Sequence, residues 1–354
     1  MFSSKSKKLI SLITGLLCVM YLLTACGGNG TGDFEKYSGD SKDTDNDTVR
    51  IGYSGRLDEL PLFAAYDKGY FIENGINAEL IKINDADIKS EYVAKRLDAV
   101  TADYRYFKFI DEGLLLKITV GLTAGCIRLI VPYHSEIKGI KDLKGCRIGV
   151  EDFGDGTLVL SSMLFKGNGI DVEDSISWKP YGENGFTKAF ENNEIDAACI
   201  WEPSEKDSEF LKEKYRTLYT NVEEGASGLK NGVHNHGAGV HFTRTYTGIS
   251  ESLIENHPEK AIFITKAWLQ GANWVSENNT QAARLVTDKG YLTGSYEENL
   301  NTLSSYMWTN GVSASKLNIR FSIKEQKSNG ILKENLNEND LFEKVFAGIF
   351  PEFY

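Results

Sequence analysis

Side chains suited to recognising a small molecule stand directly after apolar, strand-like segments of the chain. Trp201 and Glu202 follow one such segment, and Tyr53 and Ser54 follow another. An aromatic ring offers a flat surface for stacking, and a carboxylate or hydroxyl can exchange hydrogen bonds with an amine or amidine. Each ring could instead be packed in the interior at the end of its strand. These four residues are candidate ligand contacts.

Further candidates lie where another strand-like segment ends and where a long apolar stretch is interrupted. Asp103 and Tyr104 stand directly after that strand-like segment. Thr123 and Gly125 interrupt the apolar stretch, and a glycine permits close approach of backbone and ligand. Arg128 lies shortly beyond them. It could hold a carboxylate, sulfonate or phosphate through charge-assisted hydrogen bonds, or it could be solvated or ion-paired within the protein.

The segment from Gly154 to Thr157 precedes a predicted helix. Backbone N–H groups and the helix dipole make a helix N-terminus a site for anions, so Gly154, Asp155 and Thr157 are candidate ligand contacts. An ordinary Asp/Gly turn at the start of the helix is the alternative. Asp155 and Glu202 place two carboxylates near the proposed site, against the single cation Arg128. This balance favours a neutral or cationic, nitrogen-bearing ligand over an anion.

Three of the five histidines cluster at His234, His236 and His241. A zinc site needs three or four ligands in a tetrahedral arrangement, and we expect His241 to pair with at most one of the other two. We therefore predict no metal site, and no cofactor. His234 and Asn235 are candidate ligand contacts instead.

The N-terminus has the pattern of a secretory signal. Lys5, Lys7 and Lys8 precede an apolar run over residues 9–23, which is the charge order of a signal peptide. The run is shorter than the roughly 20 apolar residues that span a bilayer. It ends in Leu-Thr-Ala-Cys, which resembles the bacterial lipobox, where the signal is cut before a cysteine that carries lipid.

We therefore expect residues 1–25 to be a lipoprotein signal peptide and Cys26 to anchor the chain by lipid at the extracytoplasmic face of the cell membrane. A signal anchor with an incidental cysteine is the alternative. Residues 26–48 are rich in Gly, Ser, Asp, Asn and Thr. Such a segment cannot bury enough apolar surface to offset its ordering entropy, so we expect it to be a flexible tether.

The composition is acidic, with 39 Lys and Arg against 50 Asp and Glu and a net charge of −11. A surface of this kind argues against nucleic acid as a partner. Apart from Cys18 and Cys26, the chain has Cys126, Cys146 and Cys199, an odd number without a C-x-x-C pair. Their apolar neighbours predict buried small side chains rather than a disulfide framework.

Strand and helix patterns alternate along the body of the chain, which predicts a layered α/β architecture. Predicted strands cover residues 49–53, 76–80, 114–120, 127–131, 146–150, 176–179 and 195–201. Proline suits the first turn of a helix, and helices are predicted to begin at or near Pro61, Gly156, Gly185 and Pro258. The last third is predicted to be mainly helical, with helices carrying Ala282, Ala283 and Leu285, and then Leu300, Leu303, Tyr306 and Met307.

Four motifs follow one another along this body. They are a proline-led helix ending in Lys-Gly-Tyr-Phe (60–71), a Leu-Lys-Gly turn before a glycine–valine strand (140–150), the segment Asn193–Ala198 followed by Trp201-Glu202-Pro203, and His257-Pro258-Glu259 at the start of a helix. In order and spacing they resemble the nitrate, sulfonate, taurine and thiamine-pyrimidine group of type II substrate-binding proteins. The chain departs from that pattern at Asn193, where the group has glycine, and in the short helix 185–191.

The resemblance implies two α/β lobes joined by two crossing strands that form a hinge. Lobe one would comprise residues 49–122 plus 238–354, and lobe two would comprise 123–237. A small nitrogen-bearing solute, or a sulfonate or other oxyanion, would bind in the cleft, and the lobes would close on it by hinge bending. The implied partners are an ABC permease and its ATPase.

Two other functions stay open. One is an enzyme related to the pyrimidine-precursor synthases of this fold, which need a cysteine-rich iron motif and a donor histidine. The chain has no such cysteine run and no G-x-S-x-G, P-loop or H-E-x-x-H motif, so we predict no enzyme activity. The other is a surface sensor that has kept the fold.

Overall fold

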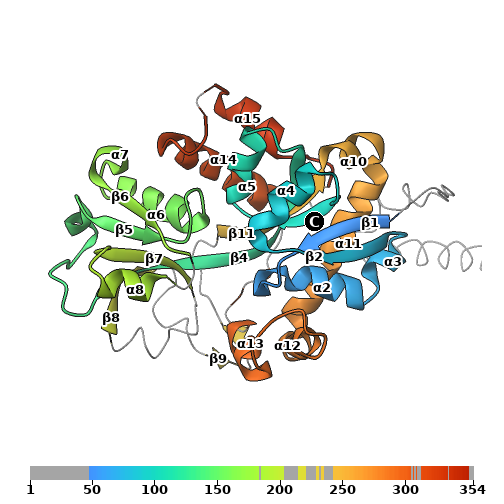
Figure 1. Cartoon of the computed structure of the whole chain (residues 1–354), viewed down its shortest axis with the longest axis horizontal. Coiled ribbons are helices and arrows are strands. Elements are labelled where there is room, and N and C mark those ends of the chain that lie inside the picture. Colours follow the sequence, from blue (N-terminus) through green and yellow to red (C-terminus); the bar gives the residue numbers. More distant parts are fainter. Residues whose placement is uncertain are drawn as a thin grey trace, which may run out of the picture. The chain divides into compact units, whose positions relative to one another are not determined.

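Nine strands of the described residues join in one mixed sheet (Figure 1). The computed structural model describes residues 48–182, 185–202, 214–220, 229–230, 233–234, 242–303, 306, 308, 312–333 and 335–350. The chain divides into two units, Met1–Asp47 and Thr48–Tyr354. The predicted signal peptide, Cys26 and the tether up to residue 47 therefore lie outside the described residues.

The sheet has the order β2-β1-β3-β11-β4-β7-β5-β6, with β8 paired to β4. β1 is parallel to β2 and β3, and β5 is parallel to β6 and β7, whereas β4 and β11 run antiparallel to their neighbours. β9 and β10 form a separate antiparallel pair. The strands are β1 (Thr48–Tyr53), β2 (Asn77–Lys82), β3 (Ala99–Ala102), β4 (Leu116–Pro132), β5 (Arg147–Val150), β6 (Ser177–Pro180), β7 (Ala197–Glu202), β8 (Tyr215–Thr220), β9 (Leu229–Lys230), β10 (Val233–His234) and β11 (Phe242–Ser250).

β4 is one strand of 17 residues that runs through both halves of the sheet. The prediction of two separate strands, 114–120 and 127–131, was wrong, because backbone pairing continues through Gly125. β11 pairs with the first part of β4 up to Gly125, and β7 and β8 pair with the part from Cys126 onward. One strand therefore sets the position of both halves.

Threonine hydroxyls link β4 to β11 inside the protein. The Oγ1 atom of Thr119 lies 2.5 Å from that of Thr247 and 3.0 Å from that of Thr265. The Oγ1 atoms of Thr123 and Thr245 are 2.7 Å apart. All five residues are fully buried, so each hydroxyl needs a partner within the protein. The hydroxyl of Thr123, a candidate ligand contact, is thus paired within the sheet.

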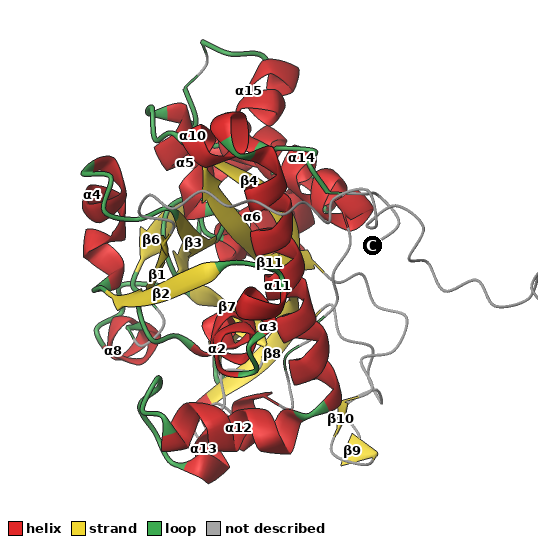
Figure 2. Ribbon diagram, turned by 90° about the vertical axis from the view of Figure 1, so that its right-hand side faces the viewer, coloured by secondary structure: helices red, strands yellow, loops and turns green. Residues whose placement is uncertain are grey.

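Helices cover both faces of the sheet: α5, α14 and α15 lie on one face, and α2, α12 and α13 on the other (Figures 1 and 2). The helices are α2 (Leu60–Asp67), α3 (Tyr70–Glu73), α4 (Ile88–Val93), α5 (Arg105–Asp111), α6 (Gly156–Gly167), α7 (Val172–Ser175), α8 (Phe186–Glu191), α10 (Glu251–Asn256), α11 (Pro258–Glu277), α12 (Asn279–Asp288), α13 (Tyr296–Leu303), α14 (Val312–Ser328) and α15 (Glu338–Val345). As predicted, a proline stands in the first turn of α2 and of α11. The prediction that a helix includes Tyr306 was wrong, because α13 ends at Leu303.

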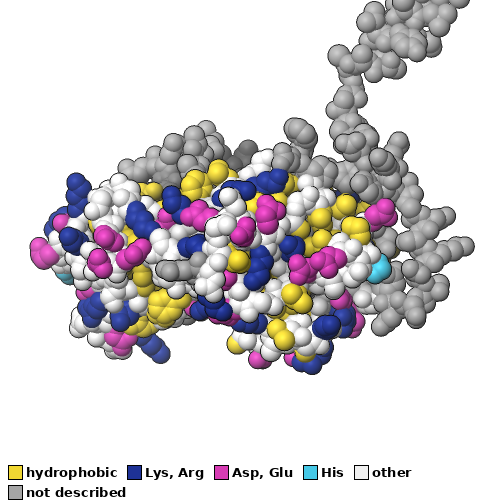
Figure 3. All heavy atoms as spheres, turned by 90° about the horizontal axis from the view of Figure 1, so that it is seen from above, with side chains coloured by type: hydrophobic (Ala, Val, Ile, Leu, Met, Phe, Trp, Pro, Cys, Tyr) yellow, Lys and Arg dark blue, Asp and Glu magenta, His cyan; other side chains and the backbone are white. Residues whose placement is uncertain are grey.

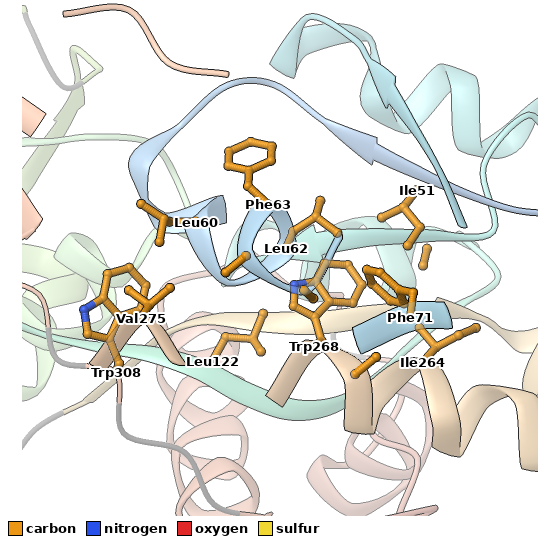
Figure 4. Close-up of a cluster of buried hydrophobic side chains, with 14 of the residues drawn as sticks. Ile51, Leu60, Leu62, Phe63, Phe71, Leu122, Ile264, Trp268, Val275 and Trp308 are labelled. Carbon is orange, nitrogen blue, oxygen red and sulfur yellow. The ribbon is translucent and has the colours of Figure 1, made fainter. Parts of the chain in front are cut away.

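A large buried cluster lies between the sheet and α2, α3 and α11 (Figure 4). Trp268 of α11 is fully buried and meets Phe71 edge-on, with ring centroids 6.3 Å apart. Leu62 and Phe63 of α2 are also fully buried in it. Burying large apolar side chains of this kind is the main favourable term in folding. The cluster holds the turn after β1 in place, because α2 follows that turn directly.

Charged side chains of both signs are interspersed over the face seen in Figure 3, and hydrophobic side chains occur there in small groups. That face therefore carries no patch of a single sign. Of the helices in the described residues, none combines the length and the apolar character that crossing a membrane requires.

Close packing of α11 against α2 predicts a large effect for Gly271→Ala. A Cβ atom at Gly271 would lie 2.8 Å from the backbone nitrogen of Ala65, and it would overlap the carbonyl oxygen of Pro61. Alanine normally stabilises a helix interior by roughly 0.5–1 kcal/mol relative to glycine. Here the overlap should reverse the sign, and we expect urea denaturation to show a loss of roughly 1–3 kcal/mol.

Gly167 of α6 provides the matched control, because a Cβ atom there would meet nothing within 4 Å. Gly167→Ala should be neutral or slightly stabilising. If both glycine variants changed the free energy of unfolding equally, the close contact between α2 and α11 would not be the cause.

Candidate ligand-binding site

Charged and aromatic side chains from the ends of several strands meet in one network, called here the strand-end cluster. Its members come from the segments after β1, β3 and β5, from the end of β7, from near the start of β11 and from the segment after α13. The cluster consists of Arg56, Asp58, Asp103, Arg105, Asp155, Trp201, Arg244 and Tyr306. Ligands of open α/β sheets bind outside the carboxyl ends of the strands, so this cluster is the candidate site.

Asp103 is the most strongly paired carboxylate of the cluster. Arg105 contacts it with Nη2 at 2.6 Å and Nε at 3.0 Å, and Nη1 of Arg56 lies 3.6 Å away. Burial alone would raise the pKa of Asp103, but the two arginines and the hydrogen bonds from Arg105 outweigh it and lower the pKa to about 2. Asp103 is therefore an anion at any ordinary pH, and its charge is already balanced by the protein.

Arg244 of β11 lies at the centre of the aromatic part of the cluster. The Cζ atom of Arg244 is 5.1 Å from the ring centroid of Trp201 and 5.1 Å from that of Tyr306. Both distances are within the range of a cation–π contact. The Nε atom of Arg244 lies 3.6 Å from Oδ2 of Asp58, whose Oδ1 accepts a hydrogen bond from Nε of Arg56 at 3.1 Å.

Trp201 is 3% exposed and packs against two glycines. A Cβ atom at Gly125 would lie 3.0 Å from the indole ring, and one at Gly156 would overlap it. Gly156 also leaves room for the ring of Tyr104, which would be 2.9 Å from such a Cβ atom. The two glycines therefore let the Trp201 ring lie directly against β4 and the start of α6.

The turn after β1 already binds a carboxylate of the chain itself. The side chain of Glu59 accepts hydrogen bonds from the backbone N–H groups of Ser54 at 2.9 Å, Gly55 at 2.7 Å and Arg56 at 2.8 Å. Glu59 is 1% exposed, and burial raises the pKa of its carboxyl group. Three N–H groups that could have held an anionic ligand are thus occupied.

The start of α6 is occupied in the same way. Asp155 is the N-cap residue, and its Oδ1 atom accepts hydrogen bonds from the backbone N–H and the hydroxyl of Thr157, both at 2.6 Å. Burial raises the pKa of Asp155, the neighbouring charge of Asp103 raises it further, and Arg244 lowers it. The helix N-terminus that the sequence suggested for an anion is therefore capped by the protein.

The other candidates are spread more widely. Tyr53 meets Phe63 and Tyr291 edge-on, with ring centroids 5.2 Å and 6.1 Å apart. Arg128 lies half-buried on β4 between β7 and β8, and burial lowers its pKa. The side chains of Glu202 and His234, and the residues Asn235, His236 and His241, lie outside what the structure describes.

Gln326 of α14 ties two candidate positions together. Its Nε2 atom donates to the carbonyl oxygen of Tyr104 at 2.9 Å and to that of Gly154 at 2.8 Å. Gln326 is fully buried, and a buried hydrogen bond of this kind fixes geometry because leaving it unmade is costly. The loops after β3 and β5 are therefore held at a set distance by a helix from the end of the chain.

Sequence reasoning missed five members of the cluster: Arg56, Asp58, Arg105, Arg244 and Tyr306. Arg56 and Asp58 follow Tyr53 and Ser54 closely, so extending that candidate turn would have included them. Arg244 gave no signal, because it stands near the amino end of an antiparallel strand.

Two further observations bear on the site. A surface hollow of about 190 Å³ lies between α3 and α11, and none of the residues lining it belongs to the strand-end cluster. Within the part of the chain that the structure describes, no three His, Cys, Asp or Glu side chains are grouped so that they could hold a metal ion.

The pairing of Asp103 predicts a pH-dependent contribution to stability. Its pKa is about 2 in the folded chain against an ordinary value of 3.8. The stability from the ionised form is therefore present above about pH 4 and is lost as the pH falls toward 2. Asp103→Asn should cost about 2 kcal/mol at pH 7, and urea denaturation at pH 3 should show roughly half that difference.

Asp98 is the matched control, since it pairs with Arg50 at 2.9 Å in a more exposed position. Exposed pairs contribute roughly 0–1 kcal/mol, so Asp98→Asn should have a smaller effect. A difference between wild type and Asp103→Asn that did not change from pH 7 to pH 3 would contradict the assignment.

Three comparisons with known proteins agree on the fold. A protein of Bacillus subtilis (strain 168), named as a candidate aliphatic sulfonates-binding protein, is 28% identical over 285 residues, which cover 77% of this chain and 76% of the relative. The alkanesulfonate-binding protein SsuA of Xanthomonas axonopodis pv. citri, bound to MOPS, superposes with a TM-score of 0.60 at 14% identity, covering 84% of this chain and 99% of that one. The periplasmic nitrate-binding protein NrtA of Synechocystis PCC 6803 gives a TM-score of 0.62 at 11% identity, covering 85% and 86%.

These structures show that the predicted α/β fold of the type II periplasmic binding proteins is correct. The family model described as NMT1/THI5 like matches residues 57–282. That range is more than half of the chain and includes β3, β4, Trp201 and Arg244. The chain therefore belongs to the NMT1/THI5-like family.

Proposed function

We propose that this protein is the solute-binding component of an ABC importer and that it binds a small solute at the strand-end cluster. The observation that carries the proposal is the meeting of Asp58, Asp103, Trp201 and Arg244 from four different strand ends in one buried network. Side chains of both signs beside an aromatic ring suit recognition of a polar solute. The relatives are named as proteins that bind sulfonates or nitrate, which supports the same role.

Within this role, a nitrogen-bearing solute fits the described geometry better than an oxyanion. The two groups of backbone N–H donors best suited to an anion already bind Glu59 and Asp155. A sulfonate would have to displace one of these carboxylates or bind elsewhere. Sulfonates are the second candidate class, because the relative from Bacillus subtilis and the MOPS-bound structure carry that description.

Binding rather than catalysis is the proposed activity. The relatives are named as binding proteins, and the charged groups of the cluster are paired with one another rather than placed as a reactive nucleophile and its base. A sensor of the same solute is the alternative, and loss of solute uptake after deletion of the gene would separate importer from sensor.

We expect Trp201 to form one wall of the binding site. Stacking of an aromatic ring contributes about 0.5–1.5 kcal/mol beyond the area that it buries, so Trp201→Ala should weaken binding by roughly 2- to 12-fold. The cognate solute is first found with a thermal-shift panel of amines, amidines, sulfonates and nitrate, and its affinity is then measured by titration calorimetry.

Trp274 is the matched control, because this half-buried side chain of α11 lies outside the strand-end cluster, with Nζ of Lys68 4.1 Å from its ring centroid. Trp274→Ala should leave the affinity unchanged. A folded Trp201→Ala protein with wild-type affinity would show that Trp201 is only part of the core.

We also propose a lipid anchor at Cys26, on the N-terminal pattern of three lysines, a short apolar run and Leu-Thr-Ala-Cys. The protein would then be held at the extracytoplasmic face of the membrane, beside its permease. Cells fed a fatty-acid probe should label the wild-type protein and not Cys26→Ser, because only the thiol can form the thioether to lipid. Equal labelling of both proteins would contradict lipid attachment at Cys26.

A further inference from the structure

We propose that Asp58, Trp201 and Tyr306 form a recognition site for a planar cation, such as a guanidinium or amidinium group, which the side chain of Arg244 occupies and which a solute takes over. This inference rests on the proposed function and names the chemical class of its solute.

The surroundings of Arg244 are those of a cation-binding site. Its guanidinium is in cation–π range of two rings, at 5.1 Å from each centroid, and in ion-pair range of a carboxylate at 3.6 Å. The side chain is only 14% exposed. Cation–π contacts strengthen when the cation is desolvated, so a planar cation placed among these three groups is well stabilised.

The charge of Asp58 determines what can replace Arg244. Its side chain is 8% exposed, its Oδ1 atom accepts from Arg56, and its Oδ2 atom faces Arg244. A buried carboxylate that loses a cationic neighbour is strongly destabilised unless another cation replaces it. A solute that carries a positive charge restores the balance. An anion would instead add a second negative charge beside Asp58.

The contact between Arg244 and Asp58 leaves room for a better partner. Their N–O distance of 3.6 Å is longer than that of the Arg105–Asp103 pair at 2.6 Å and of the Arg147–Asp196 pair at 2.7 Å. It also exceeds the 2.7–2.9 Å or so of a charge-assisted hydrogen bond. A solute that donates directly to Oδ2 would therefore pair more strongly with Asp58 than Arg244 does.

The backbone at Arg244 is irregular in a way that suits a side chain that moves. The pairing of β11 with β4 shifts register between Thr243 and Thr245, on either side of Arg244. Such irregularities re-aim a side chain and are frequent next to functional sites. Arg244 would act as an internal competitor, and the apparent affinity for the solute would be reduced to the fraction of time that the site is free of Arg244.

The test is titration calorimetry of the purified protein with methylguanidinium, and with MOPS as the anionic probe. Arg244→Ala should bind methylguanidinium at least roughly tenfold more tightly than wild type. Adding Asp58→Asn to Arg244→Ala should abolish that gain. If the double variant does not fold, Tyr306→Ala in the Arg244→Ala background carries the same test.

Arg284 provides the matched control, since its Cζ atom lies 5.3 Å from the ring centroid of Tyr296 in a similar contact on α12 and α13. Arg284→Ala should leave methylguanidinium binding unchanged. Two results would overturn the proposal: no tightening in Arg244→Ala, or loss of MOPS binding in that variant, which would make Arg244 the group that holds an anion. After either result, the proposed function would still stand if some solute of the thermal-shift panel bound in a way that depends on Trp201. If no solute bound at all, both the cation site and the proposed function would be rejected.

Discussion

The pairing of β4 along its whole length is the constraint on which the rest of the structure depends. A buried strand must find a partner for every backbone N–H and C=O group, and β4 finds them first on β11 and then on β7 and β8. The threonine hydroxyls at Thr119 and Thr123 hold β11 in register. Because the same strand supports both halves of the sheet, it sets the distance between Trp201 on β7 and Arg244 on β11.

Charge balance governs the site built on this frame. Three carboxylates and three arginines share the strand-end cluster, and each buried charge has an opposite neighbour. Because these paired charges are largely shielded from water, removing one of them without a replacement would leave an uncompensated buried charge and destabilise the protein. The turn after β1 and the start of α6, which would otherwise attract anions, are closed by Glu59 and Asp155.

Much of this arrangement could be predicted from the sequence, and the exceptions have physical causes. Alternation of strands and helices gave the α/β class, and the strand-end rule found Asp103, Asp155 and Trp201, which the structure brings into one cluster. Gly125 was interpreted as a break because glycine interrupts apolar strands, yet it serves to let the Trp201 ring lie on β4. Arg244 stands between two threonines in an alternating pattern, so nothing distinguished it from a solvated strand residue. The roles of Gly125 and Arg244 become visible only from their contacts in the folded structure.

The place of β11 in the sheet has a consequence for how the chain reaches this state. β11 lies between β3 and β4, and the paired hydroxyls of Thr119 and Thr247 are 128 residues apart in sequence. The bond from Gln326 to Tyr104 spans 222 residues. Contacts of such separation make folding slow, because the loops must close before the contacts stabilise them. Until β11 is available, the edges of β3 and β4 that pair with it have no partner, and unpaired edges invite aggregation. The sheet therefore completes only after β11, which ends at residue 250 of the 354.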